Sequence, residues 1–198
     1  GINALYAGNV MMDCLKVTDG DLGIGENRHV VGILPGSKEE AYENLSIILD
    51  AVERIGSNSL PSRKVEFLLA LATSLSLKRL SEAVSSGGEW ILENGASEEK
   101  KKGIVAYLIS SSGIRVKIVQ GRFADMLNSS EVIIGLSGMG NEQAVGLGKP
   151  VVSFPSKGPQ ITRKFLRIQR LILGEAMSIV EFKAEAVAEE VSAILSHP

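Results

Sequence analysis

The chain has 198 residues, of which 44% are hydrophobic and 22% charged, and its formal net charge is −2 at pH 7. This composition excludes an intrinsically disordered chain, and the near-neutral charge argues against a nucleic-acid-binding protein. A chain of this length buries enough surface to fold without a metal or disulfide. The single cysteine, Cys14, cannot form an internal disulfide, which fits a reducing compartment. The sequence contains neither a transmembrane stretch of ~20 apolar residues nor a recognisable signal peptide.

The chain begins at Gly1, and residues 5–9 resemble the end of a strand that enters a loop. A folded domain rarely starts in this way, so we expect the chain to be a fragment of a longer protein. We interpret residues 1–27 as an N-terminal stub and interdomain connection, and residues 28–198 as one domain.

In the first half of that domain the sequence predicts two buried strands, each followed by a helix. Arg28–Leu34 is a continuous apolar run that stops at Pro35, as a strand buried on both faces does. In Glu39–Ile55 the apolar residues recur every three or four positions, which predicts an amphipathic helix with Ser37 as its N-cap. Further segments of this half are a strand at Val65–Leu71, a helix at Leu75–Val84, and a polar, irregular surface excursion at Ser85–Lys102.

The second half continues the alternation of strands and helices. Ile104–Ile109 fits either a short strand or a helix, and Ile161, Phe165, Ile168 and Ile172 predict the apolar face of a later helix. In chain order the predicted elements are strand Arg115–Val119, helix Phe123–Leu127, strand Val132–Gly135, helix Asn141–Leu147, strand Val151–Phe154, helix Gln160–Leu173, strand Met177–Val180 and helix Lys183–Leu195.

Strands that alternate with helices indicate βαβ units, and so an α/β domain with a Rossmann-like parallel sheet and helices on both faces. Ligands of such sheets bind beyond the carboxyl ends of the strands. The loops expected to form a site are therefore Pro35–Lys38, Gln120–Arg122, Leu136–Asn141 and Pro155–Gln160.

The richest of these loops joins a strand to a helix and carries Ser137, Gly138, Met139, Gly140 and Asn141. Glycines let a backbone approach a ligand closely, and a helix N-terminus offers free N–H groups to a phosphate. The alternative is a tight turn whose glycines serve only the backbone. The loop is neither a Walker A motif nor a G-x-G-x-x-G motif, because the required Ser/Thr and third glycine are missing.

Three other residues or turns have a functional and a structural interpretation. Glu142, near the helix start, either binds the two hydroxyls of a ribose or only compensates the helix dipole. The turn with Gly36 and Ser37 either contacts a phosphate or only caps its helix. Gln160, at a loop–helix boundary, either binds sugar hydroxyls or is a capping residue.

Two further features stand outside these loops. Arg163, Lys164, Arg167 and Arg170 make the helix at Gln160–Leu173 basic, which suits either anionic lipid head groups or a solvated face. His29 belongs to no recognisable acid–nucleophile set, and we interpret it as a surface residue.

With these residues identified, the chain resembles the C-terminal, donor-binding half of a GT-B glycosyltransferase, and more narrowly the lipid-A-disaccharide synthases and their less characterised relatives. The segments that carry the resemblance are Gly8–Asp13, Ile33–Glu40, Glu131–Pro155 with its Ser137–Gln143 core, and Gly158–Gln160. Together they span nearly the whole chain.

The resemblance implies a two-domain enzyme in which this half, residues 28–198, binds a UDP-sugar donor and a missing N-terminal domain binds the acceptor. The lipid II-forming glycosyltransferase is similar over residues 122–160, which implies that Phe123 lies by the uracil, next to Arg122. It also implies that Glu142, followed by Gln143, holds the ribose, and that Gln160 contacts the donor sugar. Such enzymes use no metal or other cofactor, and their general base comes from the N-terminal domain. This chain alone is therefore expected to be inactive, with no catalytic residue identified.

Two positions depart from the family pattern. Val10 stands where such chains often have Pro, and Met139 stands where Thr or Ala is usual. Besides the leading hypothesis, two alternatives remain: an enzyme of the UDP-N-acetylglucosamine 2-epimerase type and a non-catalytic nucleotide-binding module. The expected partners are a UDP-sugar and a lipid-linked acceptor at a membrane surface, and the expected location is the cytoplasm, peripheral to the membrane.

Overall fold

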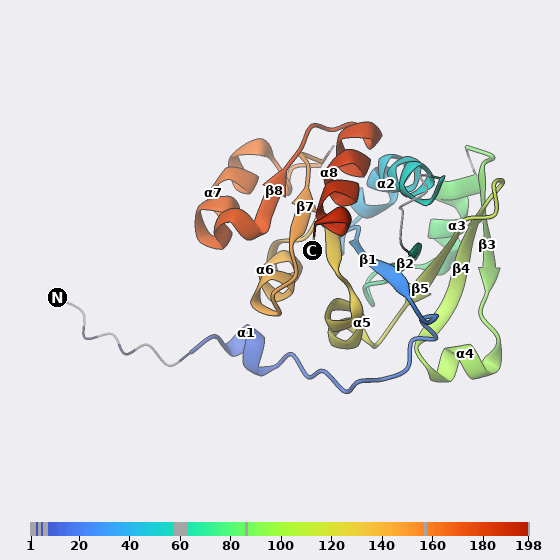
Figure 1. The fold of residues 1–198 in the computed structure, drawn as a ribbon, viewed down its shortest axis with the longest axis horizontal. Helices are drawn as coiled ribbons and strands as arrows, with labels where there is room; N and C mark the ends of the chain where they lie inside the picture. Colours follow the sequence, from blue (N-terminus) through green and yellow to red (C-terminus); the bar gives the residue numbers. More distant parts are fainter. Residues whose placement is uncertain are drawn as a thin grey trace.

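The computed structural model of the chain describes residues 3, 5, 8–57, 63–85, 87–156 and 158–197. An α/β domain follows an N-terminal segment that runs along one side of it (Figure 1). The strands are β1 (Arg28–Leu34), β2 (Lys64–Ala70), β3 (Trp90–Asn94), β4 (Ile104–Ser110), β5 (Arg115–Val119), β6 (Val132–Gly135), β7 (Val151–Ser153) and β8 (Met177–Ile179). The helices are α1 (Val10–Asp13), α2 (Glu40–Ser57), α3 (Leu77–Ser85), α4 (Ser97–Lys101), α5 (Phe123–Ser129), α6 (Gly138–Gly146), α7 (Arg163–Leu173), the short 3-10 turn η1 (Gly174–Ala176) and α8 (Ala184–Ser196).

The eight strands form one sheet in the order β3-β4-β5-β2-β1-β6-β7-β8. All neighbours from β5 to β8 pair in parallel, whereas β3, β4 and β5 pair antiparallel. Helices α2 and α8 lie against one face of the sheet and α5 and α6 against the other (Figure 1). The predicted Rossmann-like fold with a largely parallel sheet is therefore confirmed.

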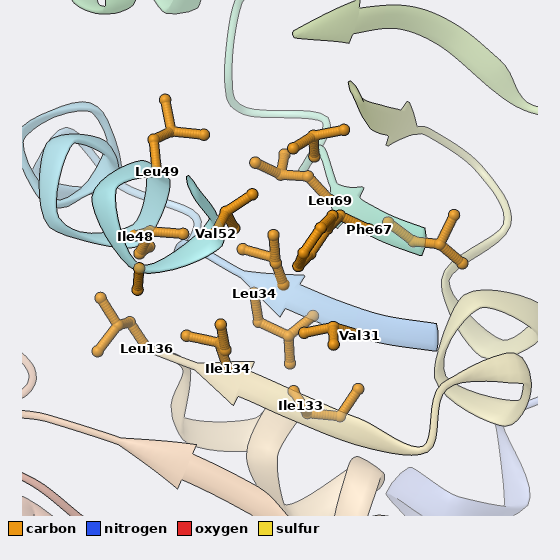
Figure 2. Close-up of a cluster of buried hydrophobic side chains, with 14 of the residues drawn as sticks. Val31, Leu34, Ile48, Leu49, Val52, Phe67, Leu69, Ile133, Ile134 and Leu136 are labelled. Atoms are coloured by element: carbon orange, nitrogen blue, oxygen red, sulfur yellow. The ribbon is translucent and has the colours of Figure 1, made fainter. Parts of the chain in front are cut away.

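The core lies between the central strands and α2. Val31 of β1 is buried beside Phe67 of β2 and Ile134 of β6, and Ile48 of α2 lies on the same side of the sheet (Figure 2). The long apolar run of β1 follows from this position, because a central parallel strand is covered on both faces.

One prediction about secondary structure needs correction, and one that was left open is decided. The segment Ser85–Lys102 is not an irregular excursion, since it contains β3 and α4. Trp90 anchors β3 because its side chain is only 5% exposed, while the other residues of that edge strand are exposed or half-buried. Ile104–Ile109, left open between strand and helix, lies in strand β4.

One predicted N-cap and some predicted helix starts also need correction, and α6 begins at Gly138 instead of Asn141. Helix α2 begins at Glu40, so its N-cap position falls at Glu39 and not at Ser37. Helix α7 begins at Arg163 and is capped by Thr162, whose Oγ1 accepts a hydrogen bond from the Phe165 N–H at 3.1 Å. Gln160 consequently lies in the loop before α7.

The N-terminal segment is attached to the domain by several hydrogen bonds and an ion pair, including a hydrogen bond from the Gly25 N–H to Glu66 at 2.9 Å. Gln143 on α6 donates a hydrogen bond from its amide to the carbonyl of Met11 at 3.3 Å. Further along, the carboxylate of Asp125 on α5 accepts hydrogen bonds from the N–H and the hydroxyl of Thr18, at 2.6 and 2.8 Å. The division at residues 27 and 28 stays a prediction.

His29 and Glu131 correct the interpretation of His29 as a surface residue. The His29 side chain is buried, and its Nδ1 lies 3.0 Å from Oε2 of Glu131, which also pairs with Arg63 at 3.2 Å. These three residues lie at the amino ends of the parallel strands, away from the loops of interest. Within the described residues no helix is long and apolar enough to cross a membrane.

Candidate functional site

Three of the four predicted loops meet at the carboxyl edge of the sheet. The register places Leu34, the last residue of β1, opposite Gly135, the last residue of β6, so the loops after these strands emerge side by side. The loop after β7, the next strand, joins them. Together they line a hollow of about 80 Å³. Of the predicted site residues, those that line it are Gly36, Ser37, Ser137, Gly138 and Gln160.

Gly36 brings the first two loops into contact. Its φ is +108°, a backbone conformation that side-chain-bearing residues rarely adopt, and a Cβ there would lie 3.2 Å from the Leu136 carbonyl oxygen. The Leu136 N–H in turn donates to the Leu34 carbonyl at 2.8 Å. Glycine is therefore required at position 36 both by the turn and by the close approach of the neighbouring loop.

Helix α6 points its N-terminus towards the hollow. Ser137 is its N-cap, and the Ser137 hydroxyl accepts a hydrogen bond from the Gly140 N–H at 3.1 Å. The N–H groups of Gly138 and Met139 have no acceptor within the described part of the chain. Free N–H groups at the start of a helix, with its positive dipole end, favour an anion such as a phosphate.

A buried polar network supports the α6 loop from behind. Asn141 is fully buried and donates from its amide to the Gly135 carbonyl at 3.2 Å and to Oε1 of Gln169 at 3.1 Å. The Gln169 amide donates to the Gly138 carbonyl at 2.8 Å, and the Ser153 hydroxyl donates to the Gly135 carbonyl at 2.6 Å. Asn141 is thus turned into the protein and holds the loop in place.

Gly135 permits this arrangement because it has no side chain. A Cβ at Gly135 would lie 2.1 Å from Oδ1 of Asn141, closer than atoms approach each other. Any other residue there would push α6 away from the end of β6.

Glu142 lies in the second turn of α6, since the helix starts at Gly138. Its side chain is half-buried, and within the described residues it makes no hydrogen bond or ion pair. The dipole of a helix acts mainly within the first turn. The structural alternative, in which Glu142 only compensates the dipole, is therefore weakened by its position.

The remaining predicted residues of α6 face different surroundings. The Met139 side chain is 67% exposed, and Gly140 is buried against the Ser137 side chain. Gln143 bonds to Met11 of the N-terminal segment, as described above. Of this stretch, Met139 is the residue most open to a ligand.

Arg122 and Phe123 do not line the hollow. They follow β5, which is separated from β1 by β2, a distance of about 10 Å at ordinary strand spacing. The Arg122 guanidinium donates to the Thr18 hydroxyl at 3.1 Å and lies 3.6 Å from Asp125. Phe123, the first residue of α5, packs partly buried against the core.

Two polar residues line the hollow that were not among the candidate site residues, although Lys38 lies in one of the predicted loops. Lys38 is exposed, lines the hollow, and makes no side-chain hydrogen bond or ion pair within the described residues. Asn44 of α2 also lines it and is only 2% exposed. Asn44 precedes Leu45 on the buried face of α2, so a polar residue on an otherwise apolar helix face was the available signal.

Contacts from α3 and from the loop before it fix the start of α2 beside the hollow. The hydroxyl of Ser74 donates to the Ser37 carbonyl at 2.7 Å, and Arg79 forms an ion pair with Glu39 at 2.5 Å. The hydrogen bond from Arg79 lowers the pKa of Glu39 below its ordinary value. Lys38 and Glu40 are the charged residues of the described lining.

The size of the hollow limits what it binds alone. Sites for small molecules usually enclose about 300–1,000 Å³, whereas this hollow measures about 80 Å³ and is open to one side. It is therefore too small to enclose a ligand as large as a nucleoside diphosphate by itself. Within the described residues no group of His, Cys, Asp and Glu could hold a metal ion.

Comparisons with known proteins agree with this architecture. No protein-family model matches the chain. Lipid-A-disaccharide synthase from Geobacter sulfurreducens is 22% identical over 203 aligned positions, which cover 98% of this chain and 46% of that protein. The chain is a distant homologue of lipid-A-disaccharide synthase. It spans about half the length of this curated relative.

Solved structures show the same fold. A putative UDP-N-acetylglucosamine 2-epimerase from Listeria monocytogenes superposes with a TM-score of 0.54 at 15% identity, over 99% of this chain and 41% of that one. The structure of ALG13 superposes with a TM-score of 0.55 at 11% identity, over 87% of each chain. The fold is thus that of one half of a GT-B glycosyltransferase or epimerase, as the sequence resemblance predicts.

Proposed function

We propose that this chain is the donor-binding half of a UDP-sugar-dependent glycosyltransferase of the lipid-A-disaccharide synthase type. The observation that carries the proposal is the N-terminus of α6, which opens into a hollow formed by the loops after β1, β6 and β7. The distant homology to lipid-A-disaccharide synthase over 98% of the chain supports it.

In this proposal the diphosphate of the donor lies at the start of α6. The free N–H groups of Gly138 and Met139 bind its oxygens, and the ammonium of Lys38 adds a positive charge from the facing loop. Gly36 and Ser37, in the same loop as Lys38, also line the proposed diphosphate site. These groups would stabilise the negative charge of the diphosphate as it leaves, a role that some enzymes give to a metal ion.

The nucleoside and the sugar extend in different directions from the diphosphate. Glu142, with its unpartnered carboxylate, takes the ribose hydroxyls, and the uracil lies towards Phe123 and Arg122. Gln160, exposed on the loop after β7, contacts the sugar. Asn141 and Gln143 act indirectly in this scheme, because their amides bond to protein carbonyls.

The chain alone is proposed to bind the donor without turning it over. The acceptor, a lipid-linked sugar at the cytoplasmic face of a membrane, and the general base would both belong to a further domain. Clear conversion of a UDP-sugar into a glycoside by residues 1–198 would contradict this part of the proposal.

Two alternatives are kept. The likeness to UDP-N-acetylglucosamine 2-epimerases from Listeria monocytogenes and Methanocaldococcus jannaschii, with TM-scores of 0.54 and 0.50, favours an epimerase as the second candidate. Product analysis separates the two, because one yields a new glycoside and the other an epimerised sugar. The third candidate is a non-catalytic nucleotide-binding module. It is kept because the exposed Met139 stands at the proposed diphosphate contact, where Thr or Ala is usual in the family.

Isothermal titration calorimetry of the 198-residue chain tests the donor site. We expect weak binding of UDP and much weaker binding of uridine, since most of the proposed contacts are to the diphosphate. Lys38→Gln should weaken UDP binding. Lys100→Gln, a matched change at an exposed position on α4, should leave UDP binding unchanged. An equal response to UDP and uridine would count against the diphosphate assignment.

A further inference from the structure

Helix α7 exposes apolar side chains instead of burying them. The sequence analysis expected Ile168 and Ile172 to face the core, but their side chains are 51% and 70% exposed, and that of Leu171 is 85% exposed. Leu166 and Gln169 are buried in their place. The reason is the polar network: the Gln169 amide must reach Gly138 and Asn141, and this turns the opposite face of α7 outward.

These three residues form one stripe. Positions 168, 171 and 172 are spaced by three and four residues, so they are neighbours on one face of the helix. The other large exposed apolar side chains of the described chain, Leu5, Val10, Ile91 and Met139, lie on other elements. Single exposed apolar residues are ordinary, whereas a cluster marks an interaction surface. Figure 1 shows α7 at the outer edge of the domain, beyond β8.

A basic stripe runs beside the apolar one. Arg163, Arg167 and Arg170 are spaced by four and three residues along α7, and Lys164 is also exposed. The helix contains no acidic residue, so it carries four positive charges on a chain whose net charge is −2. The three arginines line a groove of about 320 Å³ against Pro155, Ile179, Val180 and Glu181.

The arginines of α7 differ from the others in having no partner. Outside α7 every arginine forms an ion pair or stacks on a tyrosine ring: Arg28, Arg54, Arg63, Arg79, Arg115 and Arg122. Within the described residues the side chains of Arg163, Arg167 and Arg170 form no ion pair or hydrogen bond, although the charge of Arg163 helps to lower the pKa of Glu181. The acid nearest to them, Glu181, pairs with Lys183 at 2.6 Å. Their charges are therefore available to an external anion.

We propose that the outer face of α7 binds the surface of an anionic lipid bilayer. Ile168, Leu171 and Ile172 enter the interface, and the arginines bind lipid phosphates beside them. A helix with exposed apolar residues next to four basic ones has the composition of a membrane-surface helix. A second copy of this chain fits poorly, because a symmetric contact would bring the four cations of one α7 against those of the other. The inference does not depend on the donor site.

Co-sedimentation with lipid vesicles tests the proposal. The 198-residue chain should bind vesicles of equal parts phosphatidylcholine and phosphatidylglycerol, bind vesicles of phosphatidylcholine alone far less, and lose binding as salt is raised. The combined change Arg163→Gln, Arg167→Gln and Arg170→Gln should weaken binding about a hundredfold. Leu171→Ser with Ile172→Ser should weaken it about tenfold or more.

Matched changes elsewhere serve as controls. Lys78→Gln, Lys100→Gln and Lys101→Gln remove the same charge from other exposed positions, and Ile91→Ser removes an exposed apolar side chain, 56% accessible, from β3. These variants should bind the anionic vesicles like the unchanged chain. Circular dichroism and UDP titration of the α7 variants should be unchanged, which separates this surface from the donor site.

Three outcomes would overturn the proposal. The first is no binding of the chain to anionic vesicles, and the second is an equal loss in the α7 variants and their controls. The third is a concentration-dependent dimer, seen by analytical ultracentrifugation, that Leu171→Ser abolishes, since this would assign the face to a second copy.

Discussion

The side-chain amides of Asn141 and Gln169 are hydrogen-bonded to each other at 3.1 Å across the contact between α6 and α7. Both are buried, and each also bonds to a carbonyl of the loop that precedes or begins α6, Asn141 to Gly135 and Gln169 to Gly138. Helix α7 therefore fixes the backbone that we assign to the diphosphate, while its opposite face remains free for a membrane.

Replacing Gln169 by Leu should destabilise the protein and weaken UDP binding together. Leu has a similar volume but removes the hydrogen bonds that Gln169 makes to the Gly138 carbonyl and the Asn141 amide, and each lost hydrogen bond costs about 0.5–1.5 kcal/mol. Urea unfolding of Gln169→Leu should show this loss in the free energy of unfolding. Gln143→Leu is the matched control, since its single bond to Met11 is long, at 3.3 Å, and only half-buried. Equal losses in the two variants would contradict the supporting role of Gln169.

Ser137 offers a test that separates helix capping from ligand binding. Ser137→Ala should lower the free energy of unfolding by about 1 kcal/mol because the Gly140 N–H loses its acceptor. Ser137→Asp preserves the cap, since Asp is as good an N-cap as Ser, but it places a negative charge at the proposed diphosphate. We expect calorimetry to show native stability and lost UDP binding for Ser137→Asp.

The corresponding control is Asn9→Asp at the N-cap of α1, which adds the same charge and should leave UDP binding intact. If Ser137→Asp binds UDP as tightly as the unchanged chain, the diphosphate does not lie at the start of α6.

The sequence was sufficient to predict the central part of the fold. β1 and β6 are continuous apolar runs because parallel strands at the centre of a sheet are covered on both faces. β3 was missed because it is an edge strand with one buried anchor, Trp90, in an otherwise polar segment. The antiparallel pairing of β3 and β4 depends on contacts between strands, which local pattern does not encode.

The orientation of polar side chains was the part of the candidate site that could not be predicted. Ser137 and Gly138 line the hollow as expected, but Asn141 of the same motif is turned inward. Its direction depends on Gln169, 28 residues later in the chain. The same bond decides which face of α7 is buried, so the apolar periodicity of that helix predicted the wrong face.

Asp125 should make the attachment of the N-terminal segment sensitive to acid. Burial by itself would raise the pKa of Asp125, but hydrogen bonds from Thr18 and the Gly20 backbone outweigh it and hold the pKa below its ordinary value. A lowered pKa stabilises the folded protein above the unfolded pKa, about 3.9. This contribution is lost as the pH falls from there through the folded pKa.

Unfolding measured between neutral pH and pH 3 should therefore show less acid sensitivity in Asp125→Asn than in the unchanged chain, together with lower stability at pH 7. Limited proteolysis should cut the N-terminal segment of this variant faster, because Thr18 loses its charged acceptor. Identical pH profiles for the two proteins would show that the carboxylate does not hold the segment.

Glu142 is the residue on which the nucleotide assignment depends most sharply. Its carboxylate is half-buried, lies in the second turn of α6, and has no partner within the described residues. If it accepts hydrogen bonds from the ribose hydroxyls, each bond to the charged group contributes roughly 1.5–3 kcal/mol. Even the lower value corresponds to about a tenfold change in affinity.

Glu142→Ala should therefore lower the affinity for UDP about tenfold or more, as measured by calorimetry. The affinity for inorganic pyrophosphate should be nearly unchanged, because pyrophosphate has no ribose. Glu142→Gln should behave similarly, since it removes the charge that strengthens both bonds. Glu189→Gln, an exposed change on the distant α8, is the control and should alter neither ligand. A residue that only complemented the helix dipole would give the opposite result: UDP binding unchanged or slightly improved, and the melting temperature slightly lower. That outcome would refute the ribose contact and, with it, the placement of the nucleoside along α6.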